Sequence, residues 1–168
     1  MNMRDLLNLE LRDLYSAETQ LLDALPKMQL AASNADLKKA FADHLEETQQ
    51  QLDRLNNIAF RLKINIKGEE CQAMKGLIKE GEDIITQIGE PAVKDAALIA
   101  AAQRVEHYEI AAYGSAACFA GHCNEDEVEK LLHETLKEEG ASDKALNKLA
   151  TGKIFSSGIN NDAVKASK

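Results

Sequence analysis

Four glutamates interrupt the predicted core face of four long helical segments. Residues that face the core of a helix bundle recur in alternating steps of three and four. Counted in those steps, each segment has an apolar face with one glutamate near its middle: Glu18, Glu47, Glu106 and Glu139. Helix bundles that bind a pair of metal ions supply carboxylate ligands from facing helices in this way. The spacing therefore indicates a metal site in the core of a bundle.

The positions of these glutamates along the chain place them at one height. Antiparallel helices that are joined by a short turn face each other at equal distances from that turn. Glu18 lies fifteen residues before a turn predicted near Ser33, and Glu47 lies fourteen residues after it. Glu106 and Glu139 each lie about sixteen residues from a second predicted turn. We therefore expect the two members of each pair to meet, and all four carboxylates to form one layer.

Three more side chains on the same faces are candidate metal ligands. Glu109 lies one helical turn beyond the glutamate of the third segment, Asp143 one turn beyond that of the fourth, and His44 three residues before that of the second. His44 could instead be a core histidine satisfied by a hydrogen bond, and Asp143 could hydrogen-bond to a ligand. The full candidate set is Glu18, His44, Glu47, Glu106, Glu109, Glu139 and Asp143.

Several carboxylates buried together need cations nearby. Each one loses hydration on burial, and like charges raise one another's pKa. Oxygen ligands with an occasional imidazole suit iron or manganese better than zinc. We therefore expect two metal ions, iron or manganese, in this layer. The alternative is a solvated or hydrogen-bonded acidic pocket that holds no metal.

Composition and helix signals predict an all-α fold. The 168 residues suffice for one domain with a sizeable core, and they include two prolines and 45% hydrophobic residues. We predict a four-helix bundle over residues 1–150 and a flexible tail over residues 151–168, where glycine, serine and asparagine accumulate. Between Gly68 and Pro91 we expect a long crossover that carries one short amphipathic helix lying across the bundle. Such a crossover lets the second and third long helices run parallel.

Charge, cysteines and the N-terminal sequence argue against several classes of protein. The net charge of −8 and the lack of a basic stripe argue against nucleic-acid binding, because phosphates require concentrated positive charge. The N-terminal segment is a charged amphipathic helix with neither a signal peptide nor a membrane span. The three cysteines form no Cys-x-x-Cys motif, which argues against a disulfide framework or a zinc module. We expect a soluble protein of the reducing cytoplasm.

Four segments of the chain resemble a known family. They are Leu14–Glu18, His44–Thr48, Asp95–Glu109 and Glu134–Glu139. In these segments the chain is similar to the ferritin-like superfamily and, within it, to the YciE/YciF family of bacterial stress proteins. The resemblance implies a ferritin-like four-helix bundle related to rubrerythrins, a homodimer and a link to stress conditions. It does not imply a particular reaction.

One departure from the ferritin-like pattern concerns the imidazole ligands. Di-iron members usually carry Glu-x-x-His on the second and fourth helices. Here Gln50 follows Glu47 by three residues, and Ser142 follows Glu139 by three. The Glu-x-x-Glu of the third segment does resemble that of rubrerythrins. We therefore expect a carboxylate-rich site whose metal affinity and redox behaviour differ from those of sites with more histidines.

Three functions fit these observations. The first is a cytoplasmic stress-response protein whose two metal ions react with peroxide or oxygen, with Tyr108 or Tyr113 relaying protons or electrons. A reductase cycle would need an external electron donor, whereas dismutation of peroxide would not. The second is a metal-sequestering protein without turnover. The third is a non-catalytic dimeric interaction protein with a degenerate metal site.

Overall fold

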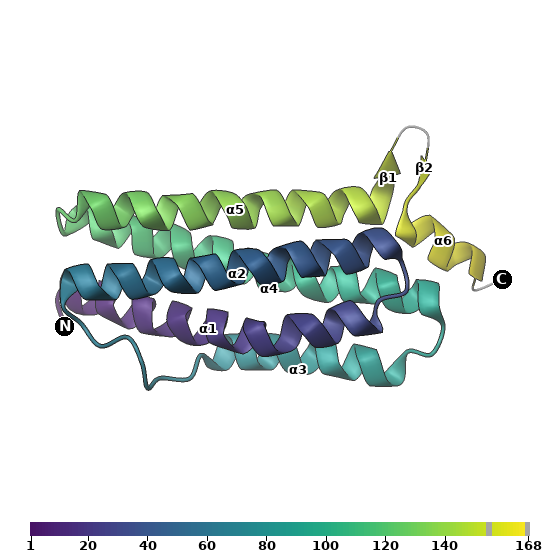
Figure 1. Cartoon of the computed structure of the whole chain (residues 1–168), viewed down its shortest axis with the longest axis horizontal. Coiled ribbons are helices and arrows are strands. Elements are labelled where there is room, and N and C mark those ends of the chain that lie inside the picture. Colours follow the sequence, from purple (N-terminus) through teal and green to yellow (C-terminus); the bar gives the residue numbers. More distant parts are fainter. Residues whose placement is uncertain (154–155, 167–168) are drawn as a thin grey trace.

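Four long helices form the body of the molecule. They are α1 (Met3–Ala31), α2 (Ala35–Leu62), α4 (Pro91–His122) and α5 (Asp126–Thr151). The structure is a computed structural model and describes residues 1–153 and 156–166. α1 packs against α2 and α4, and α5 closes the ring by packing against the same two helices (Figure 1). The predicted all-α four-helix bundle is therefore confirmed.

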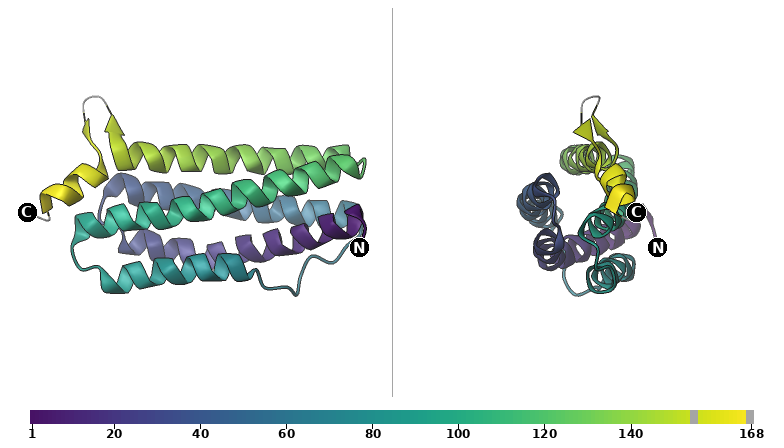
Figure 2. Two further views of the ribbon diagram at one scale, coloured as in Figure 1. Left: turned by 180° about the vertical axis from the view of Figure 1, so that it is seen from behind. Right: turned by 90° about the vertical axis from the view of Figure 1, so that its right-hand side faces the viewer.

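The directions of the helices follow from the lengths of their connections. Short turns join α1 to α2 and α4 to α5, so the helices in each of these pairs run antiparallel (Figure 1). α2 and α4 run in the same direction, as predicted, because a long connection returns the chain along the bundle between them (Figures 1 and 2). This arrangement lets all four helices contribute side chains to one interior layer.

The long connection carries helix α3 (Gln72–Gln87). α3 packs against α1 and α4, so the predicted extra helix is present. It lies alongside the bundle rather than across it (Figures 1 and 2). The reason is its apolar face, on which Leu77, Ile78, Ile84 and Ile85 pack against the core cluster that surrounds the buried Met74.

The turn between α1 and α2 is held by a buried carboxylate from α4. Asp95 is 3% exposed, and its two carboxylate oxygens accept hydrogen bonds from the backbone N–H groups of Ser33, at 2.7 Å, and Asn34, at 2.8 Å. Asn34 in turn caps α2 by accepting hydrogen bonds from the N–H groups of Asp36 and Leu37. One side chain therefore ties α4 to the point that sets the relative register of α1 and α2.

Two apolar clusters flank the acidic layer. The first includes Leu25, Phe41, Leu98 and Leu146, and the second includes Leu11, Leu55, Ile58 and Leu132. Burying a side chain of this size stabilises the fold by roughly 1.5–3 kcal/mol relative to leaving it exposed. The apolar residues on both sides therefore keep the bundle folded around a polar middle.

The end of the chain contains short elements within the segment that the sequence predicts as a flexible tail. The structure places strands β1 (Gly152–Lys153) and β2 (Ser156–Ser157) and helix α6 (Ile159–Ala166) there. α6 packs against α4 and α5, because Ile159 and Ala163 lie four residues apart on one face and are both buried. A side chain at Gly158 would lie 2.3 Å from the carbonyl oxygen of Ala150, so only glycine fits.

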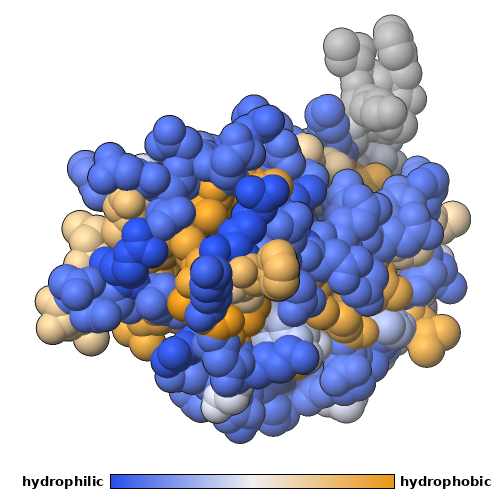
Figure 3. All heavy atoms as spheres, turned by 60° about the vertical axis from the view of Figure 1, so that its left-hand side comes forward, coloured by the Kyte–Doolittle hydropathy of each residue, from blue (hydrophilic) through white to orange (hydrophobic). Residues whose placement is uncertain are grey.

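The surface is largely polar on the face shown in Figure 3, with hydrophobic residues visible between hydrophilic ones. In the described part of the chain, six large hydrophobic side chains are exposed: Met1, Met3, Leu9, Leu30, Phe60 and Val164. Within the described residues, no helix combines the length and the apolar character needed to span a membrane.

Candidate metal centre

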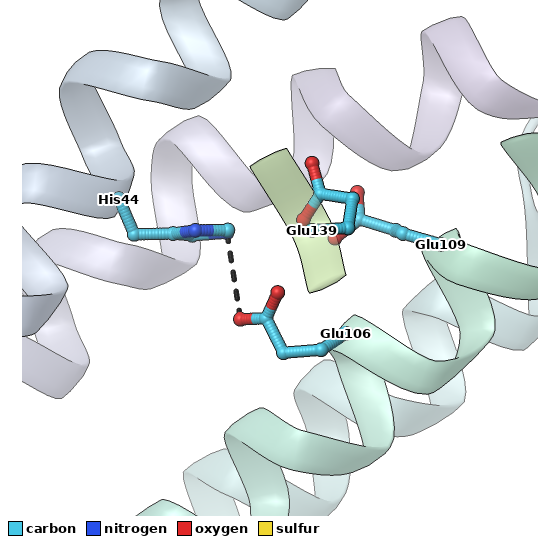
Figure 4. Close-up of side chains that lie close together, drawn as sticks. All are labelled: His44, Glu106, Glu109 and Glu139. Carbon is cyan, nitrogen blue, oxygen red and sulfur yellow. Dashed lines mark ion pairs between the residues drawn. The ribbon is translucent and has the colours of Figure 1, made fainter. Parts of the chain in front are cut away.

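Four acidic or imidazole side chains converge in the middle of the bundle. His44 comes from α2, Glu106 and Glu109 from α4, and Glu139 from α5 (Figure 4). Each contributes one possible ligand atom, and these atoms all lie within 4.8 Å of one another. Ligand atoms that surround one ion at about 2.0–2.6 Å lie within roughly 4–5 Å of each other. The group therefore has the dimensions of a metal site.

Each of these four side chains has at least one buried atom without a hydrogen-bond partner. These atoms are Nε2 of His44, Oε2 of Glu106, both carboxylate oxygens of Glu109, and Oε2 of Glu139. Buried polar atoms are normally paired, and an unpaired one costs about 1–3 kcal/mol, more if it is charged. A cation bound by these four side chains would give such atoms a partner. Three carboxylates and one imidazole are also a chemically suitable donor set for iron or manganese.

Burial changes the protonation of these side chains. It raises the pKa of Glu106 and Glu109 well above the usual range, and the negative charge of Glu139 raises both further. Burial also raises the pKa of Glu139 to about 7, and it lowers the pKa of His44 to about 4. At neutral pH His44 is therefore uncharged and offers a lone pair. The carboxyls of α4 hold protons that a bound cation would displace.

Ser142 determines which nitrogen of His44 carries the lone pair. The hydroxyl of Ser142 donates to Oε2 of Glu47 at 3.3 Å, and Nδ1 of His44 lies 3.2 Å from the same hydroxyl oxygen. A hydroxyl has a single hydrogen, so Ser142 accepts a hydrogen bond from Nδ1–H. Nε2 then carries the lone pair, and it lies 3.8 Å from Oε1 of Glu106 (Figure 4). Metal-bound histidines are usually held in this way.

Gln51 and Arg54 hold the side of the site formed by α5. The amide of Gln51 donates to Oε1 of Glu139 at 2.5 Å and to Glu138 at 3.2 Å. Arg54 binds both carboxylate oxygens of Glu138, at 2.8 and 2.9 Å, and donates to the hydroxyl of Thr135 at 2.5 Å. Arg54 was not predicted from the sequence. Its position three residues after Gln51, on the same helix face, could have indicated that Arg54 lies near the site.

Glu18 is buried beside the four residues but is not one of them. It is 0% exposed, and Tyr113 donates a hydrogen bond to its Oε1 at 2.5 Å, while Oε2 has no partner. Burial raises the pKa of Glu18 well above the usual range, and the charge of Glu139 raises it further. A carboxyl group from α1 is therefore present at the same height, as the sequence predicts.

Glu47 and Asp143 lie at the edge of the site. The side chain of Glu47 is 44% exposed and turns toward α5, while Thr48 takes the buried position on α2. Asp143 is 23% exposed, accepts a hydrogen bond from Gln103 at 3.1 Å and lies 3.4 Å from Nε2 of His107. The structure therefore does not bring these two predicted ligands into the buried group of four.

The chain matches one protein family along almost all of its length. That family, DUF892, is described as a domain of unknown function, and the match covers residues 2–160. The Escherichia coli (strain K12) protein YciF is 47% identical over 145 residues, which are 86% of this chain and 87% of YciF.

Solved structures agree with this relationship. The crystal structure of the E. coli stress protein YciF superposes with a TM-score of 0.85 at 40% identity, covering 99% of this chain and 98% of YciF. YcfI from Rhodopseudomonas palustris gives a TM-score of 0.87 at 43% identity, covering 89% of this chain and 96% of YcfI. A Xanthomonas campestris protein that is 22% identical shares the fold, with a TM-score of 0.69 over 88% of this chain and 89% of that one. The resemblance to the YciE/YciF family that the sequence indicated is confirmed by the similarity to YciF. The chain therefore belongs to the DUF892 family.

Proposed function

We propose that this protein binds iron or manganese in its core as part of a stress response, and that the bound metal reacts with peroxide or oxygen. The observation that carries the proposal is the buried group His44, Glu106, Glu109 and Glu139, whose possible ligand atoms lie within 4.8 Å of one another and whose members each have an unpartnered buried atom. The stress response is proposed because the relative YciF is called a stress protein. The fold alone would not support it, since one fold hosts many functions.

The donor set supports the choice of metal. Carboxylate oxygens and one imidazole suit iron or manganese, whereas zinc in structural sites takes thiolates. The three cysteines, Cys71, Cys118 and Cys123, are unpaired thiols and are not part of the group. Unpaired thiols also agree with the expected cytoplasmic location.

A second ion next to the first is supported by Glu18 and Glu109. Glu18 has one unpartnered oxygen, and Glu109 has two. The negative charge of Glu18 raises the pKa of Glu109, so the two carboxyls are close enough to interact. We infer that Glu18 and Glu109 would hold the second ion. Glu47 and Asp143 remain proposed outer ligands that need a change of side-chain orientation to take part.

The residues around the site would control protons. When bound, an iron or manganese pair would supply the redox chemistry for reduction or dismutation of an oxidant. Tyr113 holds a proton on its hydroxyl, because burial and the charge of Glu18 raise its pKa well above the usual range. It donates a hydrogen bond to Glu18, so a protonated phenol lies beside the carboxyl group that would hold the second ion. A reductive cycle would need an external electron donor, which stays a prediction, as does the homodimer.

The test is metal loading of chelator-treated protein with iron(II) or manganese(II), followed by measurement of bound metal, thermal stability and peroxide loss. We expect two ions per chain, a higher Tm on loading and consumption of peroxide. Glu139→Ala should abolish binding, Glu18→Ala should reduce it to one ion, and the control Glu127→Ala, at an exposed position of α5, should change neither.

Other results would favour the alternatives. Bound metal without peroxide loss would support a sequestering protein. The proposed reaction with peroxide would then be rejected. A chain that takes up neither ion under any loading would support the non-catalytic interaction protein and would overturn the proposal.

A further inference from the structure

A cavity of about 270 Å³ lies in the bundle next to the proposed metal site. Two of the four metal-site residues, His44 and Glu106, line it, whereas Glu109 and Glu139 do not. An apolar protein cavity of about 150 Å³ is large enough to bind benzene. This cavity therefore has room for a small organic molecule, well beyond the needs of a metal ion or of hydrogen peroxide.

Most of the cavity wall is apolar. It is formed by Leu21, Leu25, Met28, Phe41, Val105 and Leu146 together with several alanines. The space exists because small residues from three helices face each other, namely Ala40 on α2, Ala102 on α4, and Ala141 and Ala145 on α5. Apolar walls of this kind bind apolar groups through removal of surface from water.

The cavity opens between α2 and α5. Its exposed lining residues are Asp43 on α2 and Ala141 and Ala145 on α5. The remaining lining residues are buried or half-buried. A ligand entering there passes small side chains before it reaches the interior.

The polar atoms of the cavity gather on one side. His44, Ser142 and Glu47 are linked through the hydroxyl of Ser142, and Glu106 lies 3.8 Å from His44. Nε2 of His44 and Oε2 of Glu106 have no hydrogen-bond partner, and these side chains are 6% and 3% exposed. In the metal-free protein the lone pair on Nε2 of His44 can accept one hydrogen bond, so an O–H group is a suitable partner for it.

We propose that this cavity binds an uncharged aliphatic molecule with a terminal O–H group, such as an alkyl hydroperoxide or an alcohol, with its O–H end toward His44 and Glu106. The chain of the molecule packs against the leucines and Phe41. An anionic head group is excluded, because Glu47, Glu106 and Asp43 line the same space and Lys39 is paired with Asp43 at the surface. A catalytic role for this cavity rests on the proposed metal function, whereas binding of the aliphatic molecule does not.

Binding is tested on metal-free protein with octanol as the probe and octanoate as the charged counterpart. Calorimetric titration should show saturable binding of one octanol per chain, and NMR should show a shift of the His44 ring resonances. Octanoate should bind at least about tenfold more weakly, because its carboxylate would lie against other carboxylates.

Two variants fill the cavity from different helices. Ala145→Leu narrows the opening from α5, and Ala102→Leu fills the interior from α4, so each should weaken octanol binding by about tenfold or more. The matched control is Ala100→Leu on α4, an exposed position outside the cavity, which should bind octanol like the wild type. Circular dichroism verifies that each variant is folded, and having two filling variants keeps the test valid if one is not.

The results separate this inference from the proposed function. Absence of saturable octanol binding, or equal binding by wild type and both filling variants, would overturn the cavity assignment even if metal loading succeeds. Octanol binding that is lost in the filling variants would support it even if the chain binds no metal. Metal uptake by Ala145→Leu should match the wild type, because Ala145 contributes no ligand.

Discussion

Nδ1 of His44 on α2 lies 3.2 Å from the hydroxyl oxygen of Ser142 on α5. Ser142 occupies the position where the ferritin-like pattern has a histidine. The structure therefore gives that position a different task, which is to orient the imidazole of the facing helix instead of supplying one. This relationship accounts for a site with one histidine and several carboxylates.

Replacement of Ser142 by alanine should weaken metal binding. Without the hydroxyl, His44 loses the partner that holds Nε2 toward the carboxylates, and loss of such outer hydrogen bonds typically lowers metal affinity 10–100-fold. Competition of the loaded protein with a chelator measures the change. Ser115→Ala, at an exposed position of α4, is the control and should keep the wild-type affinity. Equal affinities for both variants would contradict this role of Ser142.

Gln51→Leu should also reduce metal affinity, by a similar factor. The amide of Gln51 fixes Glu139 at 2.5 Å, and leucine keeps the size of the side chain while removing the donor. The same chelator competition applies, with Gln50→Leu as a neighbouring exposed control. The metal-free variant should lose about 1–3 kcal/mol of stability, because Oε1 of Glu139 is left without a donor. A loss of stability with unchanged metal affinity would assign Gln51 a purely structural role.

The metal-free protein should become less stable as the pH rises from about 5 to 8. Glu18, Glu106, Glu109 and Glu139 have folded-state pKa values above the usual 4.5, with that of Glu139 at about 7. The folded chain therefore binds more protons than the unfolded chain in this range, and its free energy of unfolding falls as those protons leave. One group of this kind contributes up to a few kcal/mol.

His44 has the opposite effect on the pH dependence of stability, and it acts at acidic pH. Its folded-state pKa of about 4 lies below the usual 6.5, so its contribution to stability is lost as the pH falls through that interval. Urea unfolding at several pH values, in the presence of a chelator, measures the combined effect of the glutamates and His44 on the free energy of unfolding. Glu139→Gln should flatten the decrease near pH 7, whereas a wild-type stability that rises between pH 6 and 8 would contradict the buried acids.

Asp95→Ala should destabilise the fold by about 1–3 kcal/mol, because two backbone N–H groups of the α1–α2 turn lose their acceptors. Chemical denaturation measures the change in the free energy of unfolding. Asp53→Ala, at an exposed position of α2, should stay within about 0.5 kcal/mol of the wild type. If the two variants proved equally stable, Asp95 would not hold the turn.

The sequence by itself determined most of the acidic layer. Helical periodicity assigns each residue of a long helix to one face, so Glu18, Glu106, Glu109 and Glu139 were predictable as buried, and all four are. The equal distances from the second turn also predicted that α4 and α5 would bring their glutamates together. The same count from the first turn paired Glu18 with Glu47, whose side chain is instead 44% exposed at the edge of the site. These properties depend on local geometry, which the sequence specifies directly.

Only the tertiary structure decided which side chains of α2 complete the group. His44, Glu47 and Gln51 satisfy the steps of three and four, but so do His44, Thr48 and Gln51, and a small rotation of the helix selects between the two sets. Packing selects the second set, which buries Thr48 and leaves Glu47 at the edge. The cavity could not be predicted from the sequence either. It arises where alanines of α2, α4 and α5 meet, which depends on how these three helices pack together.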